Sequence, residues 1–425
     1  MTARSARRWA IFGVAVTAYV LGLFHRVAPV TIATDLAAAF QTSAASLGML
    51  AATYFWIYTA MQLPSGVLAD TVGPKRLLVA GGLIAAAGAG AFAAAPSFAV
   101  AAVGRTLVGL GTSVAFVATL KLTATWFDER RFATLTGLTV LAGNLASAAA
   151  GAPFAWLLGW LSWREVMALL AGASVVVALA AAFVVSDRPV RAQTPDERGL
   201  WKAGLAAVIA NRANWPIFAA NFCMGGSFFA LAGLWGVPYL MEVHGRTRLE
   251  AANHPSFMLS AFAVAALVIG TVSDRLARRK ALFVAGAAGF AASLAPLALG
   301  WKPPLAASYA LFAAMGFCAA GFTMSWASAK ELNPRRFAGI ATSFVNLAIF
   351  LGPAVQQPLV GWVLDLGGRS PGAWHMAMAV VAGSAVLGFA CTLFVRETYA
   401  RAVAEAPAAG VVSSSAARPA SRRTP

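Results

Sequence analysis

Long apolar segments recur along the whole chain, and they limit its fold more than any other feature. Each has roughly 20 residues, enough for an α-helix to cross about 30 Å of hydrocarbon. Inside lipid, a helix satisfies its own backbone polar groups. The sequence therefore predicts an all-α membrane protein with twelve transmembrane helices, near residues 10–35, 46–69, 76–95, 98–126, 132–158, 163–186, 214–240, 255–275, 280–300, 304–328, 337–365 and 374–396.

The chain carries little chemistry of the kind that enzymes use. Charged residues make up only 11% of it, whereas a soluble domain has about 25%. All 15 acidic residues fall in loops or at the ends of the predicted helices. There is no His-Glu-x-x-His pattern and no phosphate-binding loop, and Cys223, Cys318 and Cys391 have no paired spacing. We therefore expect no enzymatic activity, no metal site and no cofactor.

The net charge of +17 is explained by topology. If both termini lie on one side of the membrane, 25 of the 32 basic residues lie on that side and 5 on the other. Basic residues accumulate on the cytoplasmic side of membrane proteins. The abundance of alanine, and of arginine over lysine, is typical of bacteria with GC-rich genomes. We expect a monomer in the inner (plasma) membrane, multi-pass with both termini cytoplasmic, whose partner is the lipid bilayer and not nucleic acid.

Two patterns return about 204 residues later in the chain, each six predicted helices on. Gly66–Arg76 corresponds to Gly270–Lys280, with Asp70 matched by Asp274, and residues 130–133 return as 335–338. This duplication predicts a six-helix bundle at residues 1–186 and a second at 214–396. Residues 187–213 read as a cytoplasmic linker that contains either a helix on the membrane surface or a solvated helix. Residues 397–425 have the composition of a disordered cytoplasmic tail.

The repeated segments match a known loop signature, Gly-x-x-x-Asp-(Arg)-x-Gly-x-(Arg/Lys)-(Arg/Lys). The first copy supplies Gly66, Asp70, Gly73, Lys75 and Arg76, and an Arg-x-x-x-Gly-x-Gly pattern follows at Arg105, Gly109 and Gly111. On these motifs the chain resembles the major facilitator superfamily over residues 8–396. The resemblance implies two pseudo-symmetric six-helix bundles and transport by alternating access.

The first helix adds a narrower resemblance. Phe24-His25-Arg26, followed by Tyr54-Phe-Trp-Ile-Tyr58, is similar to the anion:cation symporter branch. Transporters of that branch often have an Asp-Arg pair in helix 1, and His25 stands here at the position of the aspartate. The Gly151-Ala-Pro153 segment only loosely resembles the motif of drug/proton antiporters.

The repeat helps to distinguish structural residues from substrate-binding residues. We expect a polar residue found in both halves to serve the shared fold, and one found in a single half to be a better candidate for binding substrate. Asp70 and Asp274 are repeated, so we assign them to a cytoplasmic gate, each near a helix N-terminus of the opposite half, where a carboxylate is stabilised. The alternative is a solvated charge that only sets topology. The expected gate consists of Gly66, Asp70, Gly73, Lys75, Arg76, Arg131, Asp274, Arg275 and Arg336.

Arg26 and Arg105 are not repeated, and an arginine inside a membrane helix usually faces a cavity. Both are candidates for binding an anionic substrate, although each could instead snorkel to the lipid headgroups. His25 could carry a coupling proton, because histidine titrates near neutrality when unperturbed; the alternative is a hydrogen-bonded structural histidine. The expected substrate-binding residues are Arg26, His25, Arg105, Tyr54, Asn144 and Asn346.

These observations predict a secondary transporter of a small solute, with an organic anion as the favoured class and a proton or another ion as the coupling partner. Two alternatives stay open at this stage. One is an efflux transporter of a drug-like or metal-chelating solute, and the other is a transporter-like sensor.

Overall fold

The computed structural model describes residues 3–187 and 195–399, and these two ranges contain helices but no β-strand. Twelve helices, or runs of consecutive helices, are long and apolar enough to cross a membrane. The predicted all-α fold with twelve membrane spans is therefore confirmed. The expected C-terminal tail lies almost wholly outside the described residues.

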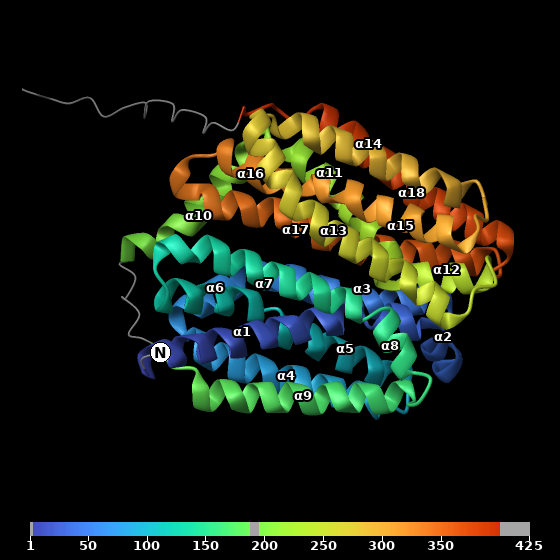
Figure 1. The fold of residues 1–425 in the computed structure, drawn as a ribbon, viewed down its shortest axis with the longest axis horizontal. Coiled ribbons are helices and arrows are strands. Elements are labelled where there is room, and N and C mark those ends of the chain that lie inside the picture. The colour runs from blue at the N-terminus through green and yellow to red at the C-terminus, as the bar shows by residue number, and fades with distance from the viewer. Residues whose placement is uncertain (1–2, 188–194, 400–425) are drawn as a thin grey trace, which may run out of the picture.

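The first six spans form one bundle, the N-half, at the bottom of Figure 1. Its helices are α1 (Ala3–Val27), α2 (Pro29–Phe40), α3 (Ala44–Thr71), α4 (Pro74–Ala93), α5 (Phe98–Thr112), α6 (Ala115–Trp126), α7 (Glu129–Ala149), α8 (Ala152–Leu157) and α9 (Trp163–Val184).

The other six spans form the C-half, at the top of the same view, and α10 (Pro195–Ala210) joins the two. The C-half consists of α11 (Asn214–Ala230), the π-helical segment η1 (Leu231–Trp235), α12 (Gly236–Glu242), α13 (Arg248–Leu276), α14 (Arg279–Ala298), α15 (Leu305–Ala319), the 3₁₀ segment η2 (Ala320–Thr323), α16 (Met324–Glu331), the 3₁₀ segment η3 (Arg335–Phe337), α17 (Ala338–Leu366) and α18 (Pro371–Leu393).

The first span differs from the predicted continuous helix at 10–35. The chain breaks between α1 and α2, and Pro29 is the first residue of α2. Proline has no N–H to donate and disfavours the helical conformation of the residue before it. The helix can therefore stop and restart here, and the break sets the position of His25 and Arg26 at the end of α1.

The two halves approach each other closely at one end of the molecule and separate at the other. We refer to the end with α2, α8 and α12 as the far end, and to the end with α10 and the N-terminus as the linker end (Figure 1). A Cβ added at Gly48 of α3 would lie 2.4 Å from the Gln357 carbonyl, and one at Gly361 of α17 would lie 2.3 Å from the Ala44 carbonyl. A Cβ added at Gly66 or at Gly339, near the other ends of these helices, would meet nothing within 4 Å.

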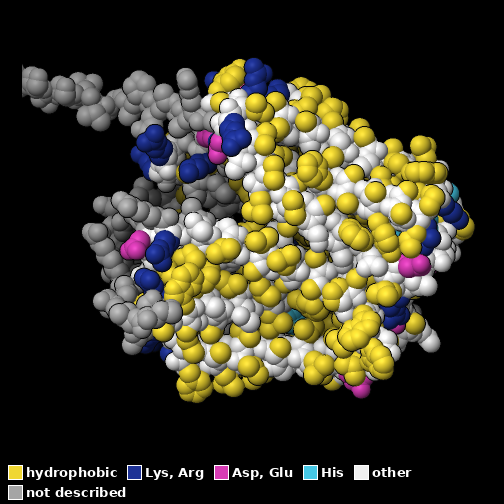
Figure 2. All heavy atoms as spheres, viewed as in Figure 1, with side chains coloured by type: hydrophobic (Ala, Val, Ile, Leu, Met, Phe, Trp, Pro, Cys, Tyr) yellow, Lys and Arg dark blue, Asp and Glu magenta, His cyan; other side chains and the backbone are white. Residues whose placement is uncertain are grey.

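Hydrogen bonds between the halves follow the same pattern. Among the described residues, they occur only at the far end, where Asp365 accepts from the Ala44 and Ala45 amides, Arg248 pairs with Asp35, and Ser256 bonds to the backbone at Ala148 and Ala152. Figure 2 shows the surface hollowed between the halves at the linker end. The structure is therefore closed at the far end and open towards the linker end.

Helix α10 lies in the segment expected to be a linker and packs on the C-half. Its Gly204 lies against Ile340 and Phe337. A Cβ added at Gly204 would lie 2.4 Å from Ile340 and 2.8 Å from Phe337, which is too close for either contact. Asn211 and Asn214 both donate to the Asn333 side chain, and Asn333 donates back to Asn214. These bonds fix the end of α10 and the start of α11 to the loop before η3. Whether α10 also lies on a membrane surface stays a prediction.

Candidate functional site

Arg105 of α5 binds the end of α1 through two backbone carbonyls. One terminal nitrogen donates to the His25 carbonyl at 2.6 Å, and the other donates to the Arg26 carbonyl at 3.0 Å. In a continuous helix the His25 carbonyl would accept from the amide of residue 29, but Pro29 has none. Arg105 therefore satisfies an acceptor that Pro29 leaves free. The side chain is buried, 4% exposed, and does not reach the surface.

Arg26 points from the end of α1 towards the C-half. Its guanidinium lies 4.9 Å from the ring centre of Phe229 and 5.8 Å from that of Phe350, and the side chain is 8% exposed. Within the two described ranges, its side chain has no ion pair, and its buried Nε has no hydrogen-bond partner. Aromatic faces attract cations, but they do not neutralise the charge. A buried guanidinium of this kind favours an anion beside it.

An aromatic series links the two arginines. The Arg105 guanidinium lies 4.6 Å from the ring centre of Tyr54, Tyr54 stacks on Tyr58, and Tyr58 packs against Phe350. The Tyr54 hydroxyl donates to the Gly22 carbonyl and accepts from Thr112. Tyr54 is thus fully buried between α1, α3 and α5.

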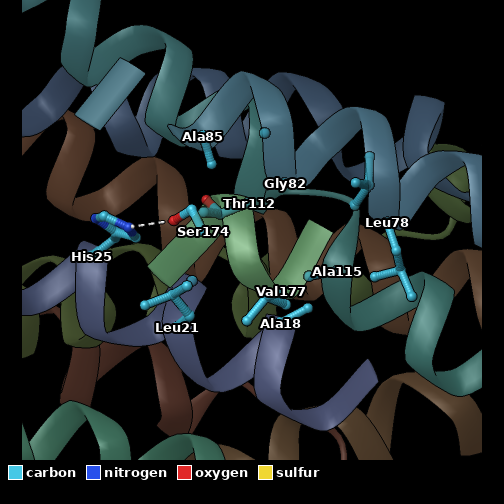
Figure 3. A pocket seen from close by; sticks show the side chains of 13 residues that line it. Ala18, Leu21, His25, Leu78, Gly82, Ala85, Thr112, Ala115, Ser174 and Val177 are labelled. Atoms are coloured by element: carbon cyan, nitrogen blue, oxygen red, sulfur yellow. Dashed lines mark hydrogen bonds between the residues drawn. The ribbon is translucent and has the colours of Figure 1, made fainter. Parts of the chain in front are cut away.

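His25 faces the interior of the N-half, away from the aromatic rings that cover Arg26. Its Nε2 lies 3.3 Å from the Ser174 hydroxyl of α9, and both border a cavity lined by residues of α1, α4, α5, α6 and α9 (Figure 3). The cavity volume is about 30 Å³, which is room for one or two water molecules. Adjacent residues of a helix point about 100° apart, so the predicted pair of His25 and Arg26 is separated into two environments.

Asn144 of α7 and Asn346 of α17 are half-buried, and no side-chain hydrogen bond to either is found in the described ranges. Gly143, next to Asn144, abuts Leu23 and Tyr19 of α1. Val345, next to Asn346, accepts a hydrogen bond through its carbonyl from the buried Asn221. Each amide thus lies beside a helix contact of its own half, and a role for Asn144 and Asn346 in binding a solute stays a prediction.

The expected gate residues gather at the linker end, but their described ion pairs lie within one half. Asp70 pairs with Lys121 of α6, and Asp274 pairs with Arg279, which also binds Glu331. Gly66 is half-buried, and Arg76, Arg131, Arg275 and Arg336 are exposed. The expected contacts between Asp70 and the start of α17, and between Asp274 and the start of α7, stay a prediction.

Gly73 shows why the loop signature contains a glycine. Its φ is +94°, which disfavours other residues, and a Cβ there would lie 2.6 Å from a carboxylate oxygen of Asp187. The same carboxylate accepts from the Lys75 amide at the start of α4. Ala277 adopts a φ of +50° at the matching turn of the C-half.

The sequence analysis missed two carboxylates that complete these turns. Glu397 accepts from the Arg279 and Lys280 amides at the start of α14, as Asp187 does from Lys75 at the start of α4. Burial alone would raise the pKa of Glu397, but the surrounding amides lower it below its ordinary value. Asp187 and Glu397 follow the sixth and twelfth spans, but they are 210 residues apart, so the repeat of 204–205 residues does not align them. The available signal was a carboxylate just after the last span of each half.

The far-end carboxylates Asp35 and Asp365 were also missed. Each is unique to its half, and each contacts the opposite half. Neither belongs to a repeated motif, so the comparison of the two halves carried no signal for them.

Comparison with known proteins agrees with this architecture. A family model described as Major Facilitator Superfamily matches residues 10–261 and 217–424. Similar folds are found in a bacterial homologue of the lysosomal transporter Spinster, with a TM-score of 0.72, 16% identity and coverage of 92% of this chain and 95% of that one. The nucleoside transporter NupG gives a TM-score of 0.75 and 15% identity, covering 91% of this chain and 100% of that one.

Three curated relatives cover most of the chain. A probable sulfoacetate transporter from Cupriavidus necator is 25% identical over 87% of this chain and 90% of its own length. A putative tartrate transporter from Agrobacterium vitis is 24% identical over 81% of this chain and 84% of its own. The D-galactonate transporter of Escherichia coli is 22% identical over 81% of this chain and 86% of its own.

Proposed function

The chain belongs to the major facilitator superfamily, and it is a multi-pass membrane transporter, not an enzyme; from this premise we propose that it carries a small organic anion across the membrane by alternating access. Arg26 binds the anion, Arg105 holds Arg26 in place, and His25 carries a coupling proton. The protein lies in a bacterial inner membrane, and its linker end faces the cytoplasm.

The observation that carries the proposal is the buried guanidinium of Arg26 at the junction of the halves, which has no ion pair within the described part of the chain. A buried charge without a partner is costly, and a substrate carboxylate or sulfonate would supply the missing negative charge. A guanidinium also binds such groups through two parallel hydrogen bonds. Sulfoacetate, tartrate and D-galactonate, named in the relatives, all carry a carboxylate.

Arg105 contributes to this site by fixing the end of α1. Both of its terminal nitrogens are bonded to backbone carbonyls, including that of Arg26. Its positive charge still lies close to the anion that Arg26 would hold. Tyr54, which packs under Arg105, supports it from α3, while Asn144 and Asn346 offer amides for the polar groups of the solute.

His25 suits a proton carrier because of where its ring lies. The imidazole is buried, its side-chain hydrogen bond in the described structure is to a hydroxyl, and it borders a cavity with room for water. Water in such a cavity can deliver a proton, and the next residue along the helix is the proposed anion ligand. Uptake of a proton at His25 would thus be sensitive to the anion at Arg26.

The test is uptake by purified protein in liposomes, with radiolabelled sulfoacetate, tartrate and galactonate as probes. Wild type is expected to take up at least one of them, more strongly when the outside is acidic. Arg26→Gln should abolish uptake, and Arg26→Lys should leave little, because an ammonium lacks the planar fork. His25→Gln should keep exchange of the anion but lose the response to a pH gradient.

Arg164→Gln is the control. Arg164 also stacks on an aromatic ring and binds backbone carbonyls, but it lies at the start of α9 and outside the proposed site. Its variant should transport as wild type does. Normal anion uptake by Arg26→Gln, or failure of wild type to take up any of the three anions, would reject the anion proposal.

A further inference from the structure

The seventh span contains a π-helical segment directly behind the aromatic cover of Arg26. In η1, Gly236 donates to the Leu231 carbonyl, five residues earlier. Phe229, whose ring lies against the Arg26 guanidinium, is separated from η1 only by Ala230. A π-turn inserts one extra residue into a helix, and it disturbs the regular pairing of carbonyls with amides around it. A side chain that bonds to the backbone at Phe229 can therefore support this turn.

Gln357 of α17 supplies that support and contacts both ends of the segment. Its Nε2 donates to the Phe229 carbonyl at 3.0 Å, and its own backbone carbonyl accepts from the Trp235 indole at 3.0 Å. Gln357 is fully buried, and its Oε1 has no partner in the described structure. Burying a polar side chain costs free energy unless its hydrogen bonds compensate for the loss of water.

Two glycines leave the space for this contact. A Cβ added at Gly233, inside η1, would lie 3.0 Å from Gln357 Nε2, and one at Gly48 of α3 would lie 2.4 Å from the Gln357 carbonyl. Gln357 is thus the point where α17, the π-helical segment and the N-half meet.

We propose that Gln357 is a positioning residue of the anion site: it bonds the Phe229 carbonyl, fixes the π-helical segment, and so holds the Phe229 ring over Arg26. This inference rests on the proposed role of Arg26 as the anion ligand. Phe229 confines the guanidinium and excludes water from one of its faces, and an anion binds a confined, dry guanidinium more strongly. Loss of the Gln357 amide should therefore weaken anion binding without removing the charge.

The neighbouring residue provides a matched control. Gln356 is also a buried glutamine on α17, but its amide group bonds to Ser384, to Ser227 and to the Cys223 carbonyl, and not to Phe229 or the π-helical segment. Gln357→Leu and Gln356→Leu each remove one buried amide of similar size. We expect KM for the transported anion in liposomes to rise about tenfold in Gln357→Leu, the effect of one lost hydrogen bond. KM should stay within about twofold of wild type in Gln356→Leu, and the maximal rate should change little in either variant.

Two further variants allow the inference to be tested even if the Gln357→Leu variant does not fold. Gly233→Ala pushes a methyl group towards Gln357 Nε2 and should raise KM in the same way. Phe229→Leu should raise KM, and adding Gln357→Leu to it should have little further effect, because both act through the same ring.

An equal rise in KM for Gln356→Leu, an unchanged KM in Gln357→Leu or in Gly233→Ala, or additive effects with Phe229→Leu would overturn the inference. These results are distinguishable from failure of the proposed function. If Arg26→Gln abolishes anion uptake while Gln357→Leu leaves KM unchanged, only the positioning role is lost. If Arg26→Gln transports normally, the anion site itself is rejected.

Discussion

At the scale of single residues, the contact between Arg105 and the end of α1 explains how a membrane helix can tolerate a buried arginine. Burying a guanidinium in a membrane span costs about 2.5–3.5 kcal/mol on insertion scales. A carbonyl without a donor in the same place is also costly. Pro29 creates such a carbonyl at His25, and Arg105 satisfies it, so the two unfavourable features compensate each other.

This pairing predicts a rescue. Arg105→Gln should destabilise the protein by about 1–3 kcal/mol, because the carbonyl of His25 loses its donor. Pro29→Ala restores an amide that can close the helix on that carbonyl, and in the Arg105→Gln background it should recover much of the loss. The measurement is the thermal unfolding of the four proteins in detergent. Purely additive effects of the two substitutions would contradict the pairing.

The comparison of the halves identified Arg26 and Arg105 from the sequence, because neither residue returns 204–205 positions later. It did not give the directions in which these side chains point. His25 and Arg26 are neighbours in the chain, yet one faces Ser174 inside the N-half and the other faces Phe229 in the C-half. That separation depends on the rotation of α1 against its neighbours, which packing decides and local sequence does not.

At the scale of elements, the start of α3 is capped by a residue of the opposite half. Asp365, at the end of α17, accepts from the Ala44 and Ala45 amides at 2.8 Å each. The first amides of a helix lack partners within it, and a carboxylate there also interacts favourably with the helix dipole. Because this cap bridges the halves, it stabilises only states that are closed at the far end.

Asp365→Ala should therefore shift the population towards states open at the far end, by about 0.5–2 kcal/mol or up to roughly thirtyfold. Spin labels at Ala38 and Leu249, which are exposed on α2 and α13, would report the change as a longer distance. Glu250→Ala is the matched control, since Glu250 caps its own helix through Thr247. It should lower stability without changing the distance distribution.

Helices and turns were predictable where the local sequence determines them. The twelve apolar spans follow from length and composition. The glycine of the turn at Gly73 belongs to the repeated motif, although the carboxylate that caps the turn does not. Pro29 carried a signal for the break in the first span. The π-helical segment at Leu231–Trp235 had no such signal, since its stability depends on Gln357, more than 120 residues away along the chain.

At the scale of the whole molecule, the orientation in the membrane has a direct test. The distribution of basic residues predicts that the linker end lies in the cytoplasm. Alkaline phosphatase, which is active only outside the cytoplasm, should be inactive when fused within α10 at Lys202 and active when fused at Gly245 between α12 and α13. Activity at Lys202 would reverse the orientation, although it would leave the fold unchanged.

The packing of α3 against α17 makes the two ends of the transporter comparable, because each end of this pair brings the last residues of one helix to the first residues of the other. At the far end, Asp365 joins the halves in the present state. At the linker end, we expect Asp70 to join α3 to the start of α17 once the hollow there has closed, because that helix start offers amides of the same kind. The pair of Asp70 with Lys121 lies within the N-half, so it can persist in both states and does not favour either.

Two carboxylates that stabilise opposite states should therefore compensate when both are removed. Asp70→Asn alone should favour opening at the linker end, and Asp365→Ala alone should favour opening at the far end. The sites are at opposite ends of the molecule, so their effects on the free-energy difference between the states should add, with opposite signs. Spin-label distances at Ala38 and Leu249, and at Thr71 and Arg335, should return close to their wild-type populations in the double variant, and transport should recover in part. If both single variants shift the populations in the same direction, or if the double variant resembles Asp365→Ala alone, Asp70 sets only the topology of its loop and is not part of a gate.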